Sequence, residues 1–339
     1  MVLPAAPEES IVVLRMRRHK LDLLARDGDT MLHMGNRWLM LENAVEANIQ
    51  ILALDALEAA EAGEAVSLSA IFKRERYQKL VAQIRDELAD YNEWADEFIT
   101  QNQRNLGKLG IEHAADALQG TLTEGGQAGM FFDKLPVSAI ENMVGIAGDG
   151  GPLQVLLEQA YPTAVDRMTD VLIKNTALGI NPRRTAREMI EGTAEALNHS
   201  LTVARTEQLR VYREASRQQY KSSGLVTEYK RLSAKNANTC AVCLALDGEV
   251  YPTDELMHVH PNCRCTMVPV VEGMPAIEWE TGEEWLKKQD PEIREQILGK
   301  GASEMLDAGD IELKDLATKT EHETWGPSLQ RTPLSELTG

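Results

Sequence analysis

All four cysteines of this 339-residue chain lie in one short stretch, "CAVCLALDGEVYPTDELMHVHPNCRC", together with two of its seven histidines. Cys240 and Cys243 form a C-x2-C pair, and a tight turn between them would point both sulfurs at one centre. Cys263 and Cys265 form a C-x-C pair, whose side chains would share one face of an extended segment. His260 stands just before this second pair. The spacing predicts a metal site, with zinc as the expected ion.

The five donors exceed the four positions of tetrahedral zinc. Either the four cysteines are the ligands, or His260 replaces one of Cys263 and Cys265, while His258 is expected to be a surface histidine. A site closed by four protein ligands would be structural, not catalytic. Two alternatives stay open: reduced thiols that hold no metal, and disulfide bonds, which are rare in proteins of the cytosol.

Between the two cysteine pairs, Asp247 and Gly248 are flanked by apolar residues, which is typical of a β-hairpin. We expect this hairpin to fold the chain back and to bring the two cysteine pairs together. Just upstream, "LVTEYKRLS" is rich in residues that favour strands, and it predicts a strand over 225–233.

The rest of the composition favours helices. Aromatic residues make up only 5% of the chain and hydrophobic residues 43%, so alanine and aliphatic residues dominate. We therefore predict an α+β protein that is mostly α, with a long N-terminal helical region followed by a helical domain that carries a small zinc-knuckle β-hairpin. The predicted parts are a helical region over 1–120, a Gly/Pro-rich linker over 121–151 with a short helix at 137–144, a domain over 152–270 and an acidic helical segment over 271–339.

Two long helices are predicted near the N-terminus. Asn36 is a candidate N-cap for the first, which should stop near Gly63, and Ser67 or Ser69 is a candidate N-cap for the second, which should run to about Leu106. Apolar residues spaced by three and four give the second helix one apolar stripe. We expect this stripe to pack within the protein, and the alternative is a rod that docks on a partner.

Within the predicted domain, Pro162 should kink or split a helix, and Asn181 should cap a helix that begins at Pro182. A further helix should end at Gly224. Three arginines at helical spacing, Arg210, Arg213 and Arg217, share one face of it. We expect an ordinary solvated face with salt bridges, and a surface for nucleic acid or an acidic partner is the alternative.

Charge and motifs exclude several classes of function. The formal net charge of −18 argues against general binding of polyanions, and no apolar stretch approaches the roughly 20 residues that span a bilayer. The start of the chain does not resemble a secretory leader, so we expect synthesis in a cytosol. The H-x-E of zinc deaminases, H-E-x-x-H, G-x-S-x-G, the P-loop and G-x-G-x-x-G are all absent. The expected protein is therefore not an enzyme, and the alternative is a zinc-dependent enzyme or toxin that acts on nucleic acid or protein.

Three motifs in this order resemble the phage head morphogenesis family, whose members are minor head proteins similar to phage Mu protein F. They are Ala204-Arg205-Thr206-Glu207, the C-x2-C with Leu246-Asp247-Gly248, and His260-Pro261-Asn262-Cys263-Arg264-Cys265 followed by Pro269. The resemblance covers about 152–270. The positions that match the family motifs outside the cysteines are Arg205, Glu207, Asp247, Gly248 and Arg264.

The resemblance implies a low-copy structural protein of a tailed double-stranded DNA phage. Such a protein is made in the host cytoplasm, enters the procapsid and the virion, and associates with portal or capsid proteins, with possible contact to packaged DNA and none to a membrane. Since Arg205 and Glu207 cannot face each other on a helix, we expect them to anchor different neighbours, namely the cysteine-rich hairpin and the adjoining helix.

Overall fold

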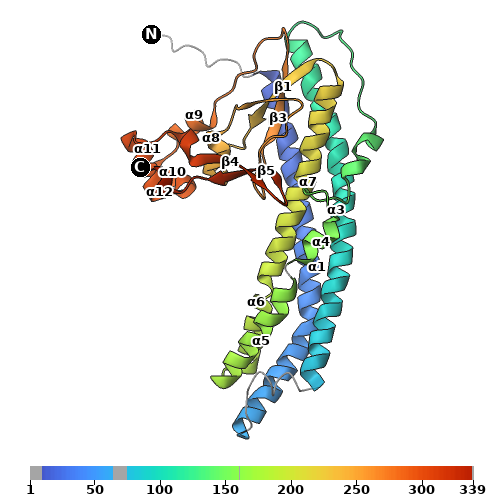
Figure 1. Ribbon diagram of the computed structural model, residues 1–339, viewed down its shortest axis with the longest axis vertical. Helices are drawn as coiled ribbons and strands as arrows, with labels where there is room; N and C mark the ends of the chain where they lie inside the picture. The colour runs from blue at the N-terminus through green and yellow to red at the C-terminus, as the bar shows by residue number, and fades with distance from the viewer. Residues whose placement is uncertain (1–9, 64–74, 160, 338–339) are drawn as a thin grey trace. The chain divides into compact units, whose positions relative to one another are not determined.

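The computed structural model describes residues 10–63, 75–159 and 161–337, and it is mostly helical with two small antiparallel sheets (Figure 1). The chain divides into two compact units. Unit 1 comprises Met1–Asp27, Asn102–Gly150 and Thr206–Gly339, and unit 2 comprises Gly28–Gln101 and Gly151–Arg205. The predicted class, α+β and mostly α, is confirmed at this level. None of the helices in the described part is long and apolar enough to cross a membrane.

The first long helix, α1, spans Ile11–Glu61. The predicted N-cap at Asn36 is therefore wrong, because the helix begins well before it and passes through it. The predicted stop is confirmed, since Gly63 follows the helix with a φ of 81°, a conformation that glycine adopts without strain. Ser67 and Ser69, the candidate caps of the next helix, lie outside the described residues.

The second long helix, α3, spans Glu75–Glu124, so the predicted end near Leu106 is also wrong. Gly107 and Gly110 do not break this helix. A Cβ atom on Gly110 would lie 2.4 Å from the backbone oxygen of Tyr212. These glycines allow a neighbouring segment to approach closely, and the helix continues through them because packing outweighs their low helix propensity.

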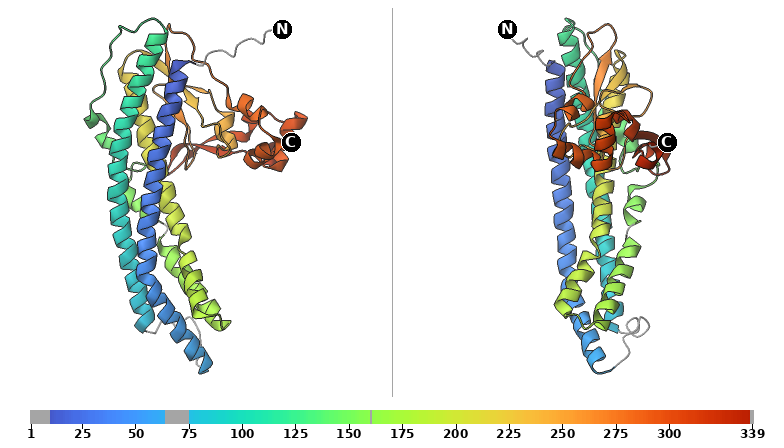
Figure 2. Two further views of the ribbon diagram at one scale, coloured as in Figure 1. Left: turned by 180° about the vertical axis from the view of Figure 1, so that it is seen from behind. Right: turned by 90° about the vertical axis from the view of Figure 1, so that its left-hand side faces the viewer.

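In unit 2, α1 and α3 lie side by side, as both views in Figure 2 show. Trp38 and Tyr91 meet edge to face at 4.9 Å between ring centroids. The expected apolar stripe is buried here, with Leu80, Ile84 and Leu88 each less than 5% exposed. Packing within the protein therefore accounts for this part of the stripe.

Three shorter helices complete unit 2: α4 (Leu153–Glu158), α5 (Tyr161–Ala177) and α6 (Pro182–Glu191). Pro162 lies in the first turn of α5, so the predicted split at this proline is confirmed. The side chain of Asn181 accepts a hydrogen bond from the backbone N–H of Arg183, which confirms the predicted N-cap of α6.

Unit 1 is built around a three-stranded antiparallel sheet. Its strands are β1 (Val226–Leu232), β2 (Val250–Pro252) and β3 (Thr266–Val271), in the order β2-β1-β3. Helix α7 (Ala194–Ser222) precedes β1 and ends before Gly224, as predicted. The predicted short helix of the linker is the 3-10 helix η1 (Val137–Met143).

The expected hairpin at Asp247-Gly248 is absent. The residues before this pair form a short helix, α8 (Ala241–Ala245), and β2 pairs with β1 instead. Gly248, with a φ of 88°, makes the turn between α8 and β2, and its N–H donates to the carbonyl oxygen of Arg231 at 2.8 Å. The Asp-Gly signal therefore marks a real turn, although it joins a helix to a strand.

The C-terminal part of unit 1 begins with three short helices and the 3-10 helix η2. Their bounds are α9 (Gly282–Lys287), α10 (Pro291–Leu298), α11 (Lys300–Ala308) and η2 (Leu313–Leu316). A hairpin of β4 (Ala317–His322) and β5 (Gly326–Arg331) follows, and then α12 (Leu334–Leu337). The hairpin corrects the prediction of a purely helical acidic segment. It also lies beside the cysteine-rich loop, since Leu329 N–H donates to the Val259 carbonyl oxygen at 2.8 Å.

A candidate metal centre

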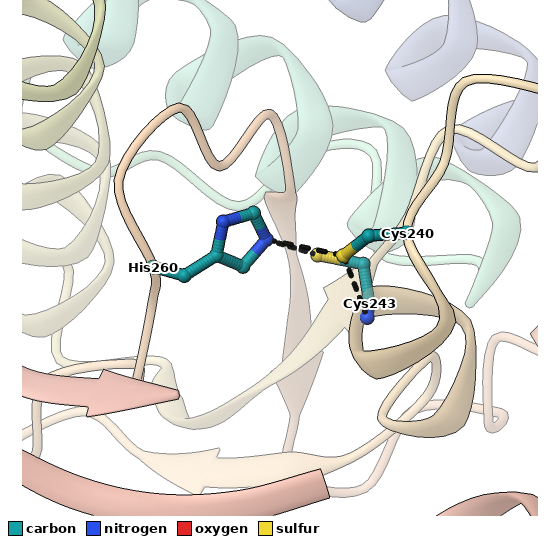
Figure 3. Close-up of side chains that lie close together, drawn as sticks. All are labelled: Cys240, Cys243 and His260. Atoms are coloured by element: carbon teal, nitrogen blue, oxygen red, sulfur yellow. Dashed lines mark hydrogen bonds between the residues drawn. The ribbon is translucent and has the colours of Figure 1, made fainter. Parts of the chain in front are cut away.

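The first cysteine pair lies at the start of α8. Cys240 is the N-cap of this helix, and its sulfur accepts a hydrogen bond from the backbone N–H of Cys243 at 3.4 Å. The Nε2 atom of His260 lies 3.2 Å from the sulfur of Cys240 and 3.2 Å from that of Cys243 (Figure 3). The helix start thus does what the C-x2-C spacing predicts and turns both sulfurs toward one point.

The second cysteine pair lies where the chain enters β3. Asn262 adopts a φ of 66°, and the N–H of Cys263 closes a turn onto the carbonyl oxygen of His260 at 3.0 Å. This turn brings the sulfur of Cys263 to 3.8 Å from that of Cys243. The sulfur of Cys265 groups with the same two sulfurs, within 4.8 Å.

The structure therefore brings together all five residues that the sequence offered as ligands. They form two overlapping groups that share Cys243 and could hold a metal ion. One group is Cys240, Cys243 and His260, and the other is Cys243, Cys263 and Cys265. His258 lies outside both groups, and it is half-buried where a surface position was expected.

The ionisation of the cluster favours a cation. Hydrogen bonds from Cys243 and from His260 lower the pKa of Cys240 to about 4. The pKa of Cys263 is also held well below its usual range, by the neighbouring thiols of Cys243 and Cys265 and by the charge of Arg231. Thiolates are the form in which cysteine binds metals, so these two sulfurs are ready ligands.

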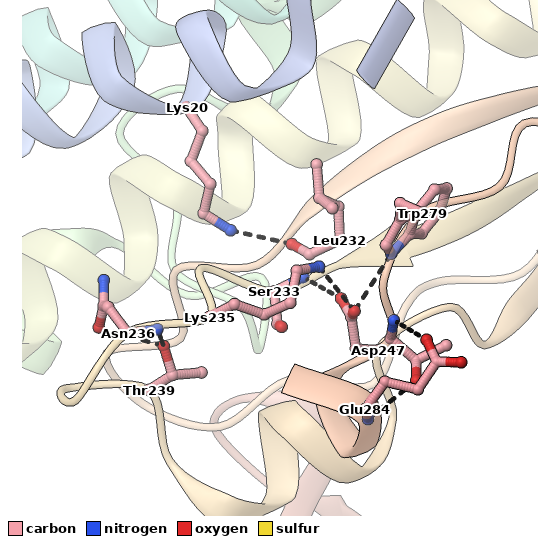
Figure 4. A network of polar contacts seen from close by, with 10 residues as sticks. Lys20, Leu232, Ser233, Lys235, Asn236, Thr239, Asp247, Trp279 and Glu284 are labelled. Atoms are coloured by element: carbon pink, nitrogen blue, oxygen red, sulfur yellow. Dashed lines mark hydrogen bonds and ion pairs between the residues drawn. The ribbon is translucent and has the colours of Figure 1, made fainter. Parts of the chain in front are cut away.

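Two buried cations lie next to the sulfurs, and sequence reasoning did not identify either. Arg231 is fully buried on β1, and its guanidinium donates to the sulfurs of Cys243 and Cys263 at 3.6 and 3.5 Å. Lys20 is 5% exposed and donates to the carbonyl oxygen of Leu232 at 2.9 Å (Figure 4). Among the described residues, neither cation forms a salt bridge with a carboxylate. The sulfurs favour the charge of both cations, and Asp247 also favours that of Lys20.

Asp247 and Gly248, two of the family-motif positions, support the end of β1. The buried carboxylate of Asp247 accepts hydrogen bonds from the backbone N–H of Ser233 at 2.6 Å, from Lys235 Nζ at 2.8 Å and from Trp279 Nε1 at 3.1 Å (Figure 4). Lys235 has a φ of 50°, so the chain turns sharply between the strand and the first cysteine pair. Asp247 therefore fixes the loop that leads into the site and is not itself a ligand.

The other family-motif residues lie on α7 and beside the cysteines. Glu207 is fully buried, and its carboxylate accepts from Gly148 N–H at 3.1 Å and from Arg210 Nε at 2.7 Å. It therefore anchors the loop before residue 150, not the cysteine-rich segment. Arg205 lies in unit 2, and Arg264 lies next to the metal-binding groups, with its Nε atom 3.9 Å from Asp27.

The arginine face of α7 is not the solvated face that was expected. Arg213 is 7% exposed, and it donates to the carbonyl oxygen of Cys263 at 3.1 Å. Arg210 pairs with Glu207 and Arg217 with Glu214, each on the same helix. The salt bridges of the prediction are present for Arg210 and Arg217, while Arg213 is buried against the cysteine-rich segment.

Comparison with known proteins gives one match. Residues 166–268 match the family described as phage Mu protein F like protein, and this range includes α7, β1, β2, the start of β3 and every candidate ligand. No curated protein and no solved structure matches the chain. The matched segment is the one on which the sequence motifs lie, and it shows that residues 166–268 are similar to phage Mu protein F like proteins.

Proposed function

We propose that this chain is a minor head protein of a tailed double-stranded DNA phage, that it acts in procapsid assembly beside portal or inner capsid proteins, and that a structural zinc ion holds its cysteine-rich segment. The match to the phage Mu protein F-like family supports the first part. The convergence of five cysteine and histidine donors from two segments of the chain supports the structural zinc ion. The protein would be made in the host cytoplasm and carried into the virion.

The contacts of His260 favour a ligand set that includes this residue. Tetrahedral zinc with Zn–S bonds of about 2.3 Å places its sulfurs roughly 3.8 Å apart. The sulfurs of Cys243 and Cys263 are separated by 3.8 Å. His260 touches Cys240 and Cys243 and also interacts with Cys263. We therefore assign Cys240, Cys243, His260 and Cys263 as the ligands, with Cys265 as an inner neighbour.

The charges around the site fit this ion. Zinc with three thiolates and one neutral histidine carries a net charge of −1, which the nearby Arg231 and Lys20 would offset. Four neutral thiols, or disulfides, would remove the thiolate charge that favours both buried cations, which is costly, and would leave Lys20 only the charge of Asp247. The zinc would supply a cross-link between α8 and the loop before β3, and its stability would add to that of the small sheet.

The zinc assignment is tested on the purified full-length chain. Elemental analysis by mass spectrometry should find one zinc per chain, and a strong chelator should remove it with loss of the near-ultraviolet circular dichroism of the domain. A metal-free chain with the same spectrum and the same thermal midpoint would reject the structural zinc.

The assembly role needs a separate test. Deleting the gene from the phage or prophage that carries it should leave particles without infectious, DNA-filled heads, and the wild-type gene supplied in trans should restore them. Affinity purification from infected cells should recover portal or capsid proteins with the chain. Normal infectious heads formed without the chain would reject this role, whatever the metal content.

A further inference from the structure

Unit 1 contains a cavity that is lined by Arg213, whose guanidinium also contacts the carbonyl oxygen of Cys263. It has a volume of about 370 Å³, in the range of sites that bind small molecules or the ends of peptides. One wall is the polar face of α7 from Thr206 to Gln218, and the opposite wall comes from the 256–259 loop and from 325–327 of the C-terminal hairpin. Three distant parts of the chain therefore build one preformed pocket.

One arginine of this pocket, Arg213, has no carboxylate partner among the described residues, although Cys263 and Cys265 favour its charge. The carboxylate of Glu207 pairs with Arg210, and that of Glu214 pairs with Arg217 through two hydrogen bonds of 2.8 and 2.6 Å. Arg213 stands between these pairs, more than nine-tenths buried, and among the described residues no carboxylate pairs with it. Within the described part of the chain, its Nη1 atom alone has a hydrogen-bond partner, the carbonyl oxygen of Cys263, so its other N–H groups are available to the cavity.

The remaining lining is apolar with two amides. Its apolar side chains include Met143, Leu256, Met257 and Trp325, which suit an aliphatic or aromatic group. The amide side chains of Asn142 and Gln218 line the same space and can pair with a peptide unit. The Nε2 atom of Gln218 already donates to Glu214 at 2.9 Å, but its carbonyl oxygen and the amide of Asn142 can pair with a peptide group, which a purely hydrocarbon acid lacks.

We propose that this pocket binds the carboxyl terminus of a polypeptide whose last residue is apolar. The terminal carboxylate pairs with the guanidinium of Arg213, whose planar fork suits two carboxylate oxygens. The last side chain lies against the apolar wall, and the preceding peptide group faces the two amides. This inference rests on neither the zinc ion nor the role in head assembly.

Isothermal titration calorimetry on the zinc-replete full-length chain tests the proposal. The probes are N-acetyl-alanyl-leucine, the same dipeptide with an amidated carboxyl terminus, N-acetyl-alanyl-aspartate, and octanoate. The leucine acid should bind at least about tenfold more tightly than its amide, because a charge-assisted pair is lost in the amide. It should also bind more tightly than the aspartate peptide, which is polar at its last side chain.

Two variants locate the binding in this cavity. Arg213→Gln should weaken the leucine acid by about tenfold or more and leave the weak binding of the amide unchanged. Leu256 is 48% exposed at the mouth of the pocket, so Leu256→Glu places a carboxylate there and should abolish binding of the leucine acid. Leu14→Glu is the matched control, because Leu14 is 52% exposed on α1 and outside the pocket. Zinc content is measured in each variant, since Arg213 also contacts the backbone of Cys263.

Four results would overturn the proposal. One is equal affinity for the acid and the amide, and another is full affinity in a Leu256→Glu variant that retains its zinc and its fold. The third is tighter binding of octanoate than of the dipeptide, which would assign the pocket to a fatty acid. Absence of binding by all probes at millimolar concentration would also reject it.

Discussion

The guanidinium of Arg231 bridges Cys243 and Cys263, donating to one sulfur at 3.6 Å and to the other at 3.5 Å. The two cysteines come from different halves of the cysteine-rich segment, so this arginine connects the helix start to the loop before β3. Burial lowers the pKa of Arg231, but charge interactions with the sulfurs of Cys265, Cys263 and Cys243 raise it well above the ordinary value. Its charge and the thiolates therefore stabilise each other.

The first prediction follows from this bridge. Arg231→Met should lower the zinc affinity by about 10–100-fold, the usual cost of losing a partner that hydrogen-bonds to a metal ligand. Competition with a chromophoric chelator measures the affinity. Lys230→Met is the control, because Lys230 is the next residue on β1 and pairs with Glu278 instead of a sulfur. An unchanged affinity in Arg231→Met would mean that the arginine balances no thiolate.

The second prediction concerns the ligand set. Single substitutions Cys240→Ser, Cys243→Ser, Cys263→Ser and His260→Asn should each reduce bound zinc below one per chain, while Cys265→Ser should retain one. Replacing zinc with cobalt gives a direct reading, since charge-transfer absorption grows with the number of sulfur ligands. The absorption of Cys265→Ser should equal that of the wild type. If Cys265→Ser loses its metal and His260→Asn retains it, the four-cysteine set is correct instead.

The candidate ligands could be predicted from the sequence because their geometry is local. C-x2-C at a helix start and C-x-C in an extended segment each converge through neighbouring residues, whatever the rest of the chain does. The turn at Asp247-Gly248 could not be assigned correctly from the sequence, because the same pair suits both a hairpin and a turn from helix to strand. Cys240 caps α8, so the residues between Cys240 and Asp247 form a helix and not the first strand of a hairpin.

The partners of the sulfurs could not be predicted, because they come from distant parts of the chain. Lys20 on α1 reaches Leu232, which is 212 residues away in the sequence. Arg213 has the helical spacing of a surface arginine, and only the packing of the cysteine-rich segment against α7 buries it. Local patterns indicate helices and strands, whereas burial of a charged side chain depends on tertiary contacts.

The third prediction is a loss of stability in acid caused by a buried histidine pair. His19 and His113 stack at 3.9 Å between ring centroids, and both are less than 10% exposed. Burial lowers the pKa of His19, and burial together with the charge of His19 lowers the pKa of His113 to about 4. Asp116 and Asp22 face the pair and raise these pKa values only in part.

The sign of the effect follows from the lowered pKa. Between pH 6.5 and 4 the unfolded chain binds a proton at residue 113 and the folded chain does not, so stability is full above pH 6.5 and falls as the pH drops toward 4. The loss approaches about 3 kcal/mol for this shift of the pKa from 6.5 to about 4. Urea unfolding between pH 7 and 4 measures it. His113→Gln should flatten the curve, while His322→Gln, at an exposed position, should leave it unchanged.

The fourth prediction uses two glycines in long helices. A methyl group at Gly110 would lie 2.4 Å from the backbone oxygen of Tyr212, and a backbone atom cannot rotate away. Gly110→Ala should therefore destabilise unit 1 by about 1–3 kcal/mol, despite the better helix propensity of alanine.

At Gly28, which also lies within a long helix, substitution by alanine should have the opposite effect on stability. Gly28 lies within α1, and nothing stands within 4 Å of the position where its Cβ would be. Gly28→Ala should raise the stability by roughly 0.5–1 kcal/mol, since only the gain in helix propensity remains. Denaturant midpoints by circular dichroism compare the two variants with the wild type. A gain of stability in both variants would show that helix propensity, not close packing against Tyr212, decides the effect of a side chain at Gly110.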